Sequence, residues 1–141
     1  MDRFSAYEFN FDIVHTISKS SHHEEICSCI RNLLIKSVEK RLLSDRPIGA
    51  LLSGGLDSSL ICGIISKVYK EKGIKNKLKT FSIGIKGSTD LVYAQNVADY
   101  INSEHHNIEC TEEEFLNAIP EVIYNIESYD TTTVRASVGN Y

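Results

Sequence analysis

Ser53-Gly54-Gly55-Leu56-Asp57-Ser58-Ser59 follows the apolar run 48–52 and precedes apolar residues at helical spacing. This order predicts a strand, a tight turn and a helix. Adjacent glycines let the main chain approach a ligand closely, and the first N–H groups of a helix favour an anion. A plain turn explains the glycines but not three serines and an aspartate at one helix start. We therefore predict a site for a polyphosphate with Mg²⁺, formed by Ser53, Gly54, Gly55, Asp57, Ser58 and Ser59, with Asp57 as the metal ligand.

Two better-known phosphate motifs do not fit this loop. A Walker A motif requires Gly-Lys-Ser/Thr after four residues, and no lysine follows Gly55. The dinucleotide fingerprint requires Gly-x-Gly-x-x-Gly, whereas Gly54 and Gly55 are adjacent. For Asp57, a role as a plain helix cap is the alternative to metal binding, because aspartate is a common cap.

Composition limits the function classes. The chain has 141 residues and a net charge of −4, which suits one domain and gives no basic footprint for nucleic acid. Its four cysteines form no Cys-x-x-Cys pair, which favours a reducing compartment. No signal peptide or membrane-length apolar run is evident, so we expect a cytoplasmic protein without membrane contact.

The hydrophobic pattern predicts alternating helices and strands. Helices are expected over about 24–43, between the loop and Gly73, after Ser88, and from Thr111 onward, where Thr111-x-x-Glu114 is a capping-box signature and Pro120 predicts a kink or two short helices. Strands are expected over 48–52, over 78–85 with Phe81, Ile83 and Ile85 on one face, and over 105–110. This alternation indicates an α/β fold, a Rossmann-like parallel sheet with helices on both faces, incomplete in this chain. We expect a poorly defined N-terminal arm over residues 1–22 and one partial domain over 23–141. Ligands of such sheets bind at the carboxyl ends of the strands.

Four segments resemble asparagine synthetases, members of the N-type ATP pyrophosphatase superfamily with its adenine nucleotide α-hydrolase-like fold. The segments are Arg46–Ser59, Thr80–Ile85, Ser103–His106 and Glu127–Ser137. The first is similar to the pyrophosphate loop of the whole superfamily. The last contains Thr-Thr-x-Arg-Ala-Ser, which is much more specific to asparagine synthetases and close relatives such as β-lactam synthetases.

The resemblance implies a role for each matching position. Leu52 and Ile83 would contact adenine through the backbone, and the 53–59 loop would hold the phosphates of ATP with Mg²⁺ at Asp57. The catalytic residues would be Thr132, Thr133 and Arg135, on the aspartate and AMP side. The implied reaction joins the β-carboxylate of aspartate to AMP, and ammonia then displaces the AMP.

The chain also departs from the family. Asp2 stands where glutamine-using members carry a cysteine nucleophile, and the family's Ser-Gly-Glu-Gly-x-Asp-Glu loop and downstream lysine are absent. We therefore expect a fragment that is inactive alone, and a separate chain carrying the rest of the synthetase and a glutaminase is a candidate partner. The alternatives are a non-catalytic nucleotide- or partner-binding module and a related ATP pyrophosphatase of the β-lactam synthetase type.

Overall fold

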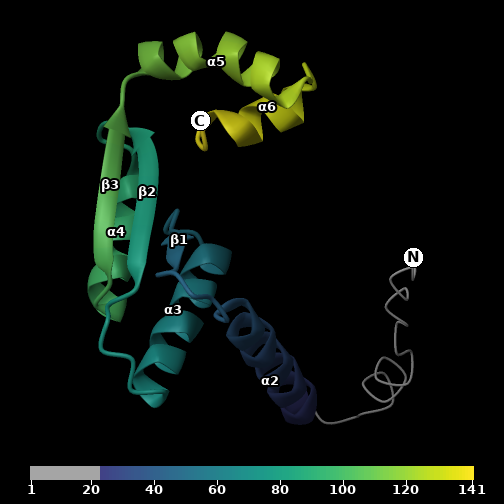
Figure 1. Ribbon diagram of the computed structural model, residues 1–141, viewed down its shortest axis with the longest axis vertical. Coiled ribbons are helices and arrows are strands. Elements are labelled where there is room, and N and C mark those ends of the chain that lie inside the picture. The colour runs from purple at the N-terminus through teal and green to yellow at the C-terminus, as the bar shows by residue number, and fades with distance from the viewer. Residues whose placement is uncertain (1–22) are drawn as a thin grey trace. The chain divides into compact units, whose positions relative to one another are not determined.

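The computed structural model describes residues 23–141, so the arm predicted over residues 1–22 lies outside the described residues (Figure 1). The chain divides into two compact units, Met1–Lys40 and Arg41–Tyr141. In the first, the described element is the helix α2 (His23–Arg41), close to the prediction of 24–43. The second unit contains the sheet and the predicted phosphate loop, and it is described by itself below.

The second unit alternates strands and helices as predicted. Its elements are β1 (Gly49–Leu51), α3 (Leu56–Glu71), β2 (Lys79–Ile85), α4 (Thr89–Ile101), β3 (Glu104–Cys110), α5 (Glu112–Ile126) and α6 (Thr131–Val138). The strands form a parallel sheet in the order β1-β2-β3. Leu51 is in register with Phe81, and Phe81 with His106. The α/β class with an incomplete parallel sheet is therefore confirmed.

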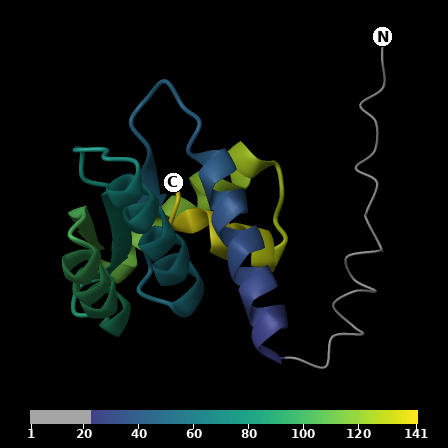
Figure 2. The same ribbon diagram turned by 90° about the horizontal axis from the view of Figure 1, so that it is seen from below.

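Helices α3 and α4 lie on the same face of this sheet. Both crossovers advance in one direction, from β1 to β2 and from β2 to β3, and right-handed connections then place both helices on one side. Figure 2 shows α3 and α4 side by side, in contact with each other. The core of the unit lies largely beneath them and includes Leu52, Cys62, Ile65, Val68, Leu78, Leu91, Ala94, Ala98 and Ile101.

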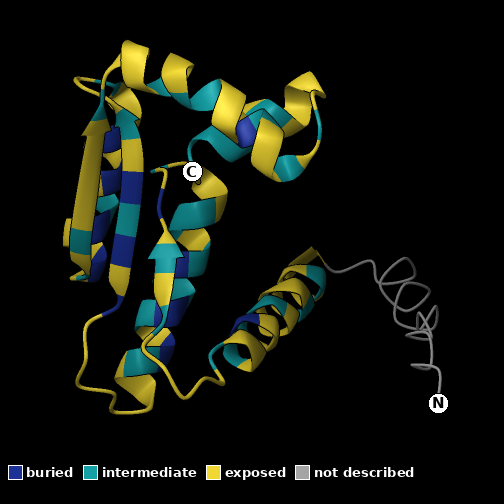
Figure 3. Ribbon diagram, turned by 45° about the horizontal axis from the view of Figure 1, so that its top comes forward, coloured by how far each residue is buried: buried dark blue, intermediate teal, exposed yellow. Residues whose placement is uncertain are grey.

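The opposite face of the sheet is less covered. Burial alternates along β2, where Thr80 and Ser82 are buried and the intervening Phe81 and Ile83 are not (Figure 3). Among the described residues, α3 and α4 thus cover one face and leave apolar side chains exposed on the other.

The two C-terminal helices follow β3. The predicted capping box at Thr111 and Glu114 is confirmed at the start of α5. This helix runs through Pro120 without interruption, so the predicted alternative of two short helices is wrong; the apolar face of α5 holds it as one element. None of the described helices has the length and apolar character needed to cross a membrane.

Candidate functional site

The loop between β1 and α3 leaves the sheet at its carboxyl edge. The N–H of Leu52 donates to the carbonyl of Phe81 at 2.8 Å, which is the last bond joining this segment to β2. Gly54 then turns the chain with a φ of +78°, and Gly55 is the N-cap residue of α3. The predicted order of strand, glycine turn and helix is therefore present.

Gly54 is required by a neighbouring helix as well as by its own φ. A Cβ at this position would lie 2.5 Å from the backbone N of Ala94 and 2.6 Å from the Cβ of Tyr93, both in α4. The sequence suggested that Gly54 lets the backbone approach a ligand closely, whereas the structure shows that the glycine lets the loop pack closely against α4. At Gly55 an added Cβ would meet only the Oγ of Ser53, at 3.4 Å, so this glycine is the one with open space beside it.

Serine hydroxyls hold the loop in shape. The Oγ atoms of Ser53 and Ser58 lie 2.9 Å apart, and the Ser58 hydroxyl also accepts from the N–H of Ser53 and donates to the carbonyl of Gly55. The buried Oγ of Ser59 has no hydrogen-bond partner among the described residues. The loop is thus preorganised by its own hydroxyls and retains one unused polar atom.

The N-terminus of α3 is open. Gly55 provides no side-chain cap, and within the described residues no hydrogen bond engages the N–H groups of Leu56, Asp57 and Ser58. Three free N–H groups and the positive end of the helix dipole favour an anion. The helix α4 also begins without a side-chain cap, so the open terminus identifies this site only together with the serine loop.

By contrast, side chains close the N-termini of α5 and α6. At α5, the hydroxyl of Thr111 accepts from the N–H of Glu114 at 3.2 Å. At α6, the carboxylate of Asp130 accepts from both the N–H and the hydroxyl of Thr133, and these two bonds are 2.8 Å long. The N–H and hydroxyl of Thr111 in turn donate to the carboxylate of Glu114. The bonds that these two carboxylates accept lower the pKa of Glu114 and of Asp130, because they stabilise the charged forms. The carboxylate of Asp130 therefore occupies the place that an anion would take at α6.

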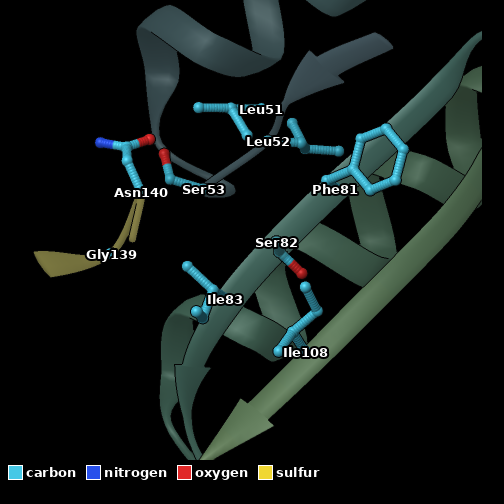
Figure 4. Close-up of a pocket in the computed structure, with 9 residues that line it drawn as sticks. All are labelled: Leu51, Leu52, Ser53, Phe81, Ser82, Ile83, Ile108, Gly139 and Asn140. Carbon is cyan, nitrogen blue, oxygen red and sulfur yellow. The ribbon is translucent and has the colours of Figure 1, made fainter. Parts of the chain in front are cut away.

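An apolar cavity of about 260 Å³ lies beside the loop (Figure 4). Its wall consists of Leu51, Leu52, Ser53, Phe81, Ser82, Ile83, Ile108, Gly139 and Asn140. In Figure 4, Leu51, Leu52 and Ser53 lie across the cavity from Ile83 and Ile108, and Asn140 lies on the side of Ser53. The structure thus places two predicted adenine contacts, Leu52 and Ile83, on one apolar wall next to the phosphate loop.

A second cavity, of about 560 Å³, lies between α5 and α6. It shares Ile83 and Gly139 with the first cavity, so the two adjoin. Arg135 and Thr131 line it, whereas the predicted Thr132 and Thr133 do not. The hydroxyl of Thr133 donates to Asp130 instead. Of the three predicted catalytic residues, Arg135 is the one that lines either of these two cavities.

Asp57 is in the first turn of α3 but is not its cap, because the N-cap residue is Gly55. It is exposed at the helix mouth. No cluster of three histidine, cysteine or acidic side chains that could hold a metal occurs in the described part of the chain. One carboxylate beside a phosphate site suits Mg²⁺, which binds one or two carboxylates together with substrate phosphates and water.

Two residues of the first cavity had no sequence signal. Gly139 and Asn140 follow α6 and carry no motif, yet the turn after this helix returns them to the carboxyl ends of β1 and β2. The cap at Asp130 was also missed, although an aspartate directly before a helix is a recognised N-cap signal.

Comparison with known proteins gives a consistent family. The sequence model of the asparagine synthase family matches residues 29–141 of this chain. The glutamine-hydrolyzing asparagine synthetase of Cricetulus griseus is 47% identical over 131 residues, which cover 93% of this chain and 23% of that protein. The enzymes of Gallus gallus and Homo sapiens are 48% and 46% identical, over 92% and 93% of this chain and 23% of each relative. The chain thus spans about a quarter of the length of the curated relatives it matches.

Proposed function

Because the chain belongs to the asparagine synthase family, we propose that residues 41–141 form the ATP-binding part of an asparagine synthetase. In this reaction ATP activates the β-carboxylate of aspartate as β-aspartyl-AMP, pyrophosphate leaves, and ammonia displaces AMP. Asparagine synthesis is what the names of the relatives state for those proteins.

The observation that carries the proposal is the open N-terminus of α3 beside an apolar cavity. Three free N–H groups and the Ser53–Ser58 pair would hold the phosphates, and Leu52 and Ile83 would bound the adenine. Base and phosphates then bind at the carboxyl ends of parallel strands, where ligands of such sheets bind.

Charge is the main obstacle to this reaction, since a carboxylate must approach an anionic phosphate. Mg²⁺ would neutralise part of the phosphate charge, with Asp57 as its protein ligand. The guanidinium of Arg135 forms no hydrogen bond or ion pair with another described residue, and Arg135 lines the cavity that adjoins the proposed adenine site. A free guanidinium there would stabilise negative charge that develops in the transition state.

The test is Mg²⁺-dependent ATP binding, measured by calorimetry on the whole chain. Asp57→Asn should weaken binding at least tenfold in the presence of Mg²⁺ and change it little without Mg²⁺, because it removes the metal ligand. Asp90→Asn is the matched control, since Asp90 is the second residue of α4 as Asp57 is of α3. An equal effect of the two substitutions would reduce Asp57 to a general helix-dipole charge and contradict the metal role.

We also infer that the isolated chain does not complete the synthesis. Its described residues supply one phosphate-binding helix terminus and one candidate metal carboxylate, and loss of a single preorganised donor costs about 10²–10³ in rate. Pyrophosphate release from ATP with aspartate and ammonium should therefore be at background for the chain alone. Sustained turnover would contradict this inference, whereas ATP binding without turnover in any assembly would favour the binding-module alternative.

A further inference from the structure

Tyr93 of α4 lies against the predicted phosphate loop. A Cβ built on Gly54 would lie 2.6 Å from the Cβ of Tyr93 and 2.7 Å from its carbonyl carbon, so the base of this side chain touches the glycine turn. The residue as a whole is not packed away, because it is 60% exposed. Its neighbour Ala94, which also touches Gly54, is fully buried. Tyr93 is therefore fixed at its base and accessible beyond it, beside the loop proposed to hold phosphates.

The direction of the helix decides where the phenol reaches. A helix that connects two parallel strands runs back along the sheet, so α3 and α4 both begin at the carboxyl edge. Side chains on a helix are tilted toward its N-terminus, and long aromatic ones lean the same way. Tyr93 is four residues beyond the first residue of α4, which is about 6 Å along the helix axis. A tyrosine side chain spans a similar length, so its hydroxyl extends toward the carboxyl edge.

The groups at that edge lack a phosphate oxygen rather than a donor. The first N–H groups of α3 are free, and Gly55 leaves open space beside them. The hydroxyl of Tyr93 forms no hydrogen bond with any residue that the structure describes. A phenol O–H is a donor that needs no charge of its own, and its bond to an anion is about twice as strong as a neutral one.

We propose that Tyr93 is a phosphate-binding residue of this site: its hydroxyl donates to an oxygen of the polyphosphate held at the N-terminus of α3, and its ring, seated on Gly54, walls the loop on the side of α4. The proposal rests on the proposed function, because the ligand is the polyphosphate part of ATP. It adds a donor from the second crossover helix to those that the 53–59 loop supplies.

The experiment measures the binding of pyrophosphate, ATP and adenosine to the whole chain by calorimetry, with Mg²⁺ present. Tyr93→Phe removes one oxygen atom and keeps the ring on Gly54. It should lower the affinity for pyrophosphate and for ATP about tenfold, because a donor to a charged oxygen is lost. Adenosine carries no phosphate, so its affinity should not change.

Tyr100→Phe is the matched control. Tyr100 belongs to the same helix and is 89% exposed, but it lies in the last turn, at the end of α4 away from the loop. The same chemical change there should leave all three affinities unchanged. Equal losses from the two substitutions would overturn the proposal, because the effect would then not depend on the position beside the loop.

A second measurement separates phosphate binding from packing. In a chain labelled with ¹³C at Cζ of tyrosine, the resonance missing from Tyr93→Phe identifies Tyr93, and it should shift when pyrophosphate is added while that of Tyr100 does not. A packing role predicts a different pattern, in which Tyr93→Phe binds pyrophosphate normally and only Tyr93→Ala, which removes the ring, binds it weakly. That pattern would overturn the proposal.

The failure of this proposal is distinguishable from failure of the proposed function. If Tyr93→Phe kept its affinity while Asp57→Asn still weakened Mg-ATP binding, the role of Tyr93 would be wrong and the nucleotide site would stand. If the unaltered chain bound neither pyrophosphate nor ATP, the nucleotide site itself would be wrong, and the role of Tyr93 with it.

Discussion

The two faces of the sheet carry different side chains. On the face that α3 and α4 cover, β2 and β3 place Thr80, Ser82 and His105. On the opposite face, which we call the open face, the same strands place Ile83, Ile85 and Ile108. Thr80 is fully buried and Ile85 is 41% exposed. Polar side chains are thus inside and apolar ones outside, the reverse of the usual arrangement. On the covered face, the polar side chains of Thr80, Ser82 and His105 are hydrogen-bonded to one another. The open face carries exposed apolar side chains that neither α3 nor α4 covers.

The polar side chains of the covered face form one chain of hydrogen bonds, of which Thr80 and Ser82 are the buried members. Ser103 and Thr80 are 2.8 Å apart, Thr80 lies 2.9 Å from Nδ1 of His105, and Nε2 of His105 lies 3.1 Å from the hydroxyl of Ser82. Ser82 donates onward to Asn107. With a neutral ring the bonds from Thr80 through His105 and Ser82 to Asn107 can all run in one direction, while the hydroxyl of Ser103 donates to the carbonyl of Ala98. Buried polar groups satisfied in this way are tolerated in a core, whereas unpaired ones are costly.

The largest expected difference between the two faces concerns two neighbouring leucines. Leu52 is 1% exposed and Leu51 is 69% exposed. Leu52→Ala should lower the free energy of unfolding by about 2–5 kcal/mol, because it leaves a cavity in the core. Leu51→Ala should change it by less than about 0.5 kcal/mol in the chain alone. Urea unfolding of both variants measures the difference, and similar losses would mean that the open face is already buried.

Local sequence signals were sufficient for the elements around the site. Gly54 and Gly55 after an apolar run predicted the turn between β1 and α3, and the Thr111–Glu114 pair predicted the start of α5. Each of these depends on residues a few positions apart. The α/β class followed from the alternation of elements, because that pattern also repeats locally.

Features that depend on distant contacts could not be predicted. The packing of Gly54 on Ala94 joins residues of two helical crossovers, and no periodicity encodes it. Phe81, Ile83 and Ile85 were correctly expected to share one face, but the pattern does not say whether a helix covers that face. At α6, the sequence could not show that Arg135 lines a cavity whereas Thr132 and Thr133 do not.

The smallest expected difference is the pH dependence of stability, which separates the neighbours His105 and His106. His105 belongs to the covered face, and burial together with the charge of His106 holds its pKa below the ordinary value of 6.5. His106 lies on the open face, stacked on Phe81. As the pH falls below about 6.5, the unfolded chain binds a proton at position 105 that the folded chain does not, so stability declines until the folded His105 also protonates.

Melting temperatures measured between pH 8 and pH 5 test this dependence. His105→Asn should flatten the decline, because the group that titrates differently in the two states is gone. His106→Asn should preserve most of it, because burial is the larger cause of the lowered His105 pKa and the charge of His106 the smaller. A further decline below about pH 4.5 should remain in both variants, since the folded-state pKa values of Glu114 and Asp130 are lowered by their caps and those carboxylates lose that stabilisation on protonation. If His106→Asn flattened the profile as much as His105→Asn, the titration could not be assigned to the covered face. The paired hydroxyls of Thr80 and Ser82 would then no longer account for a neutral ring between β2 and α4.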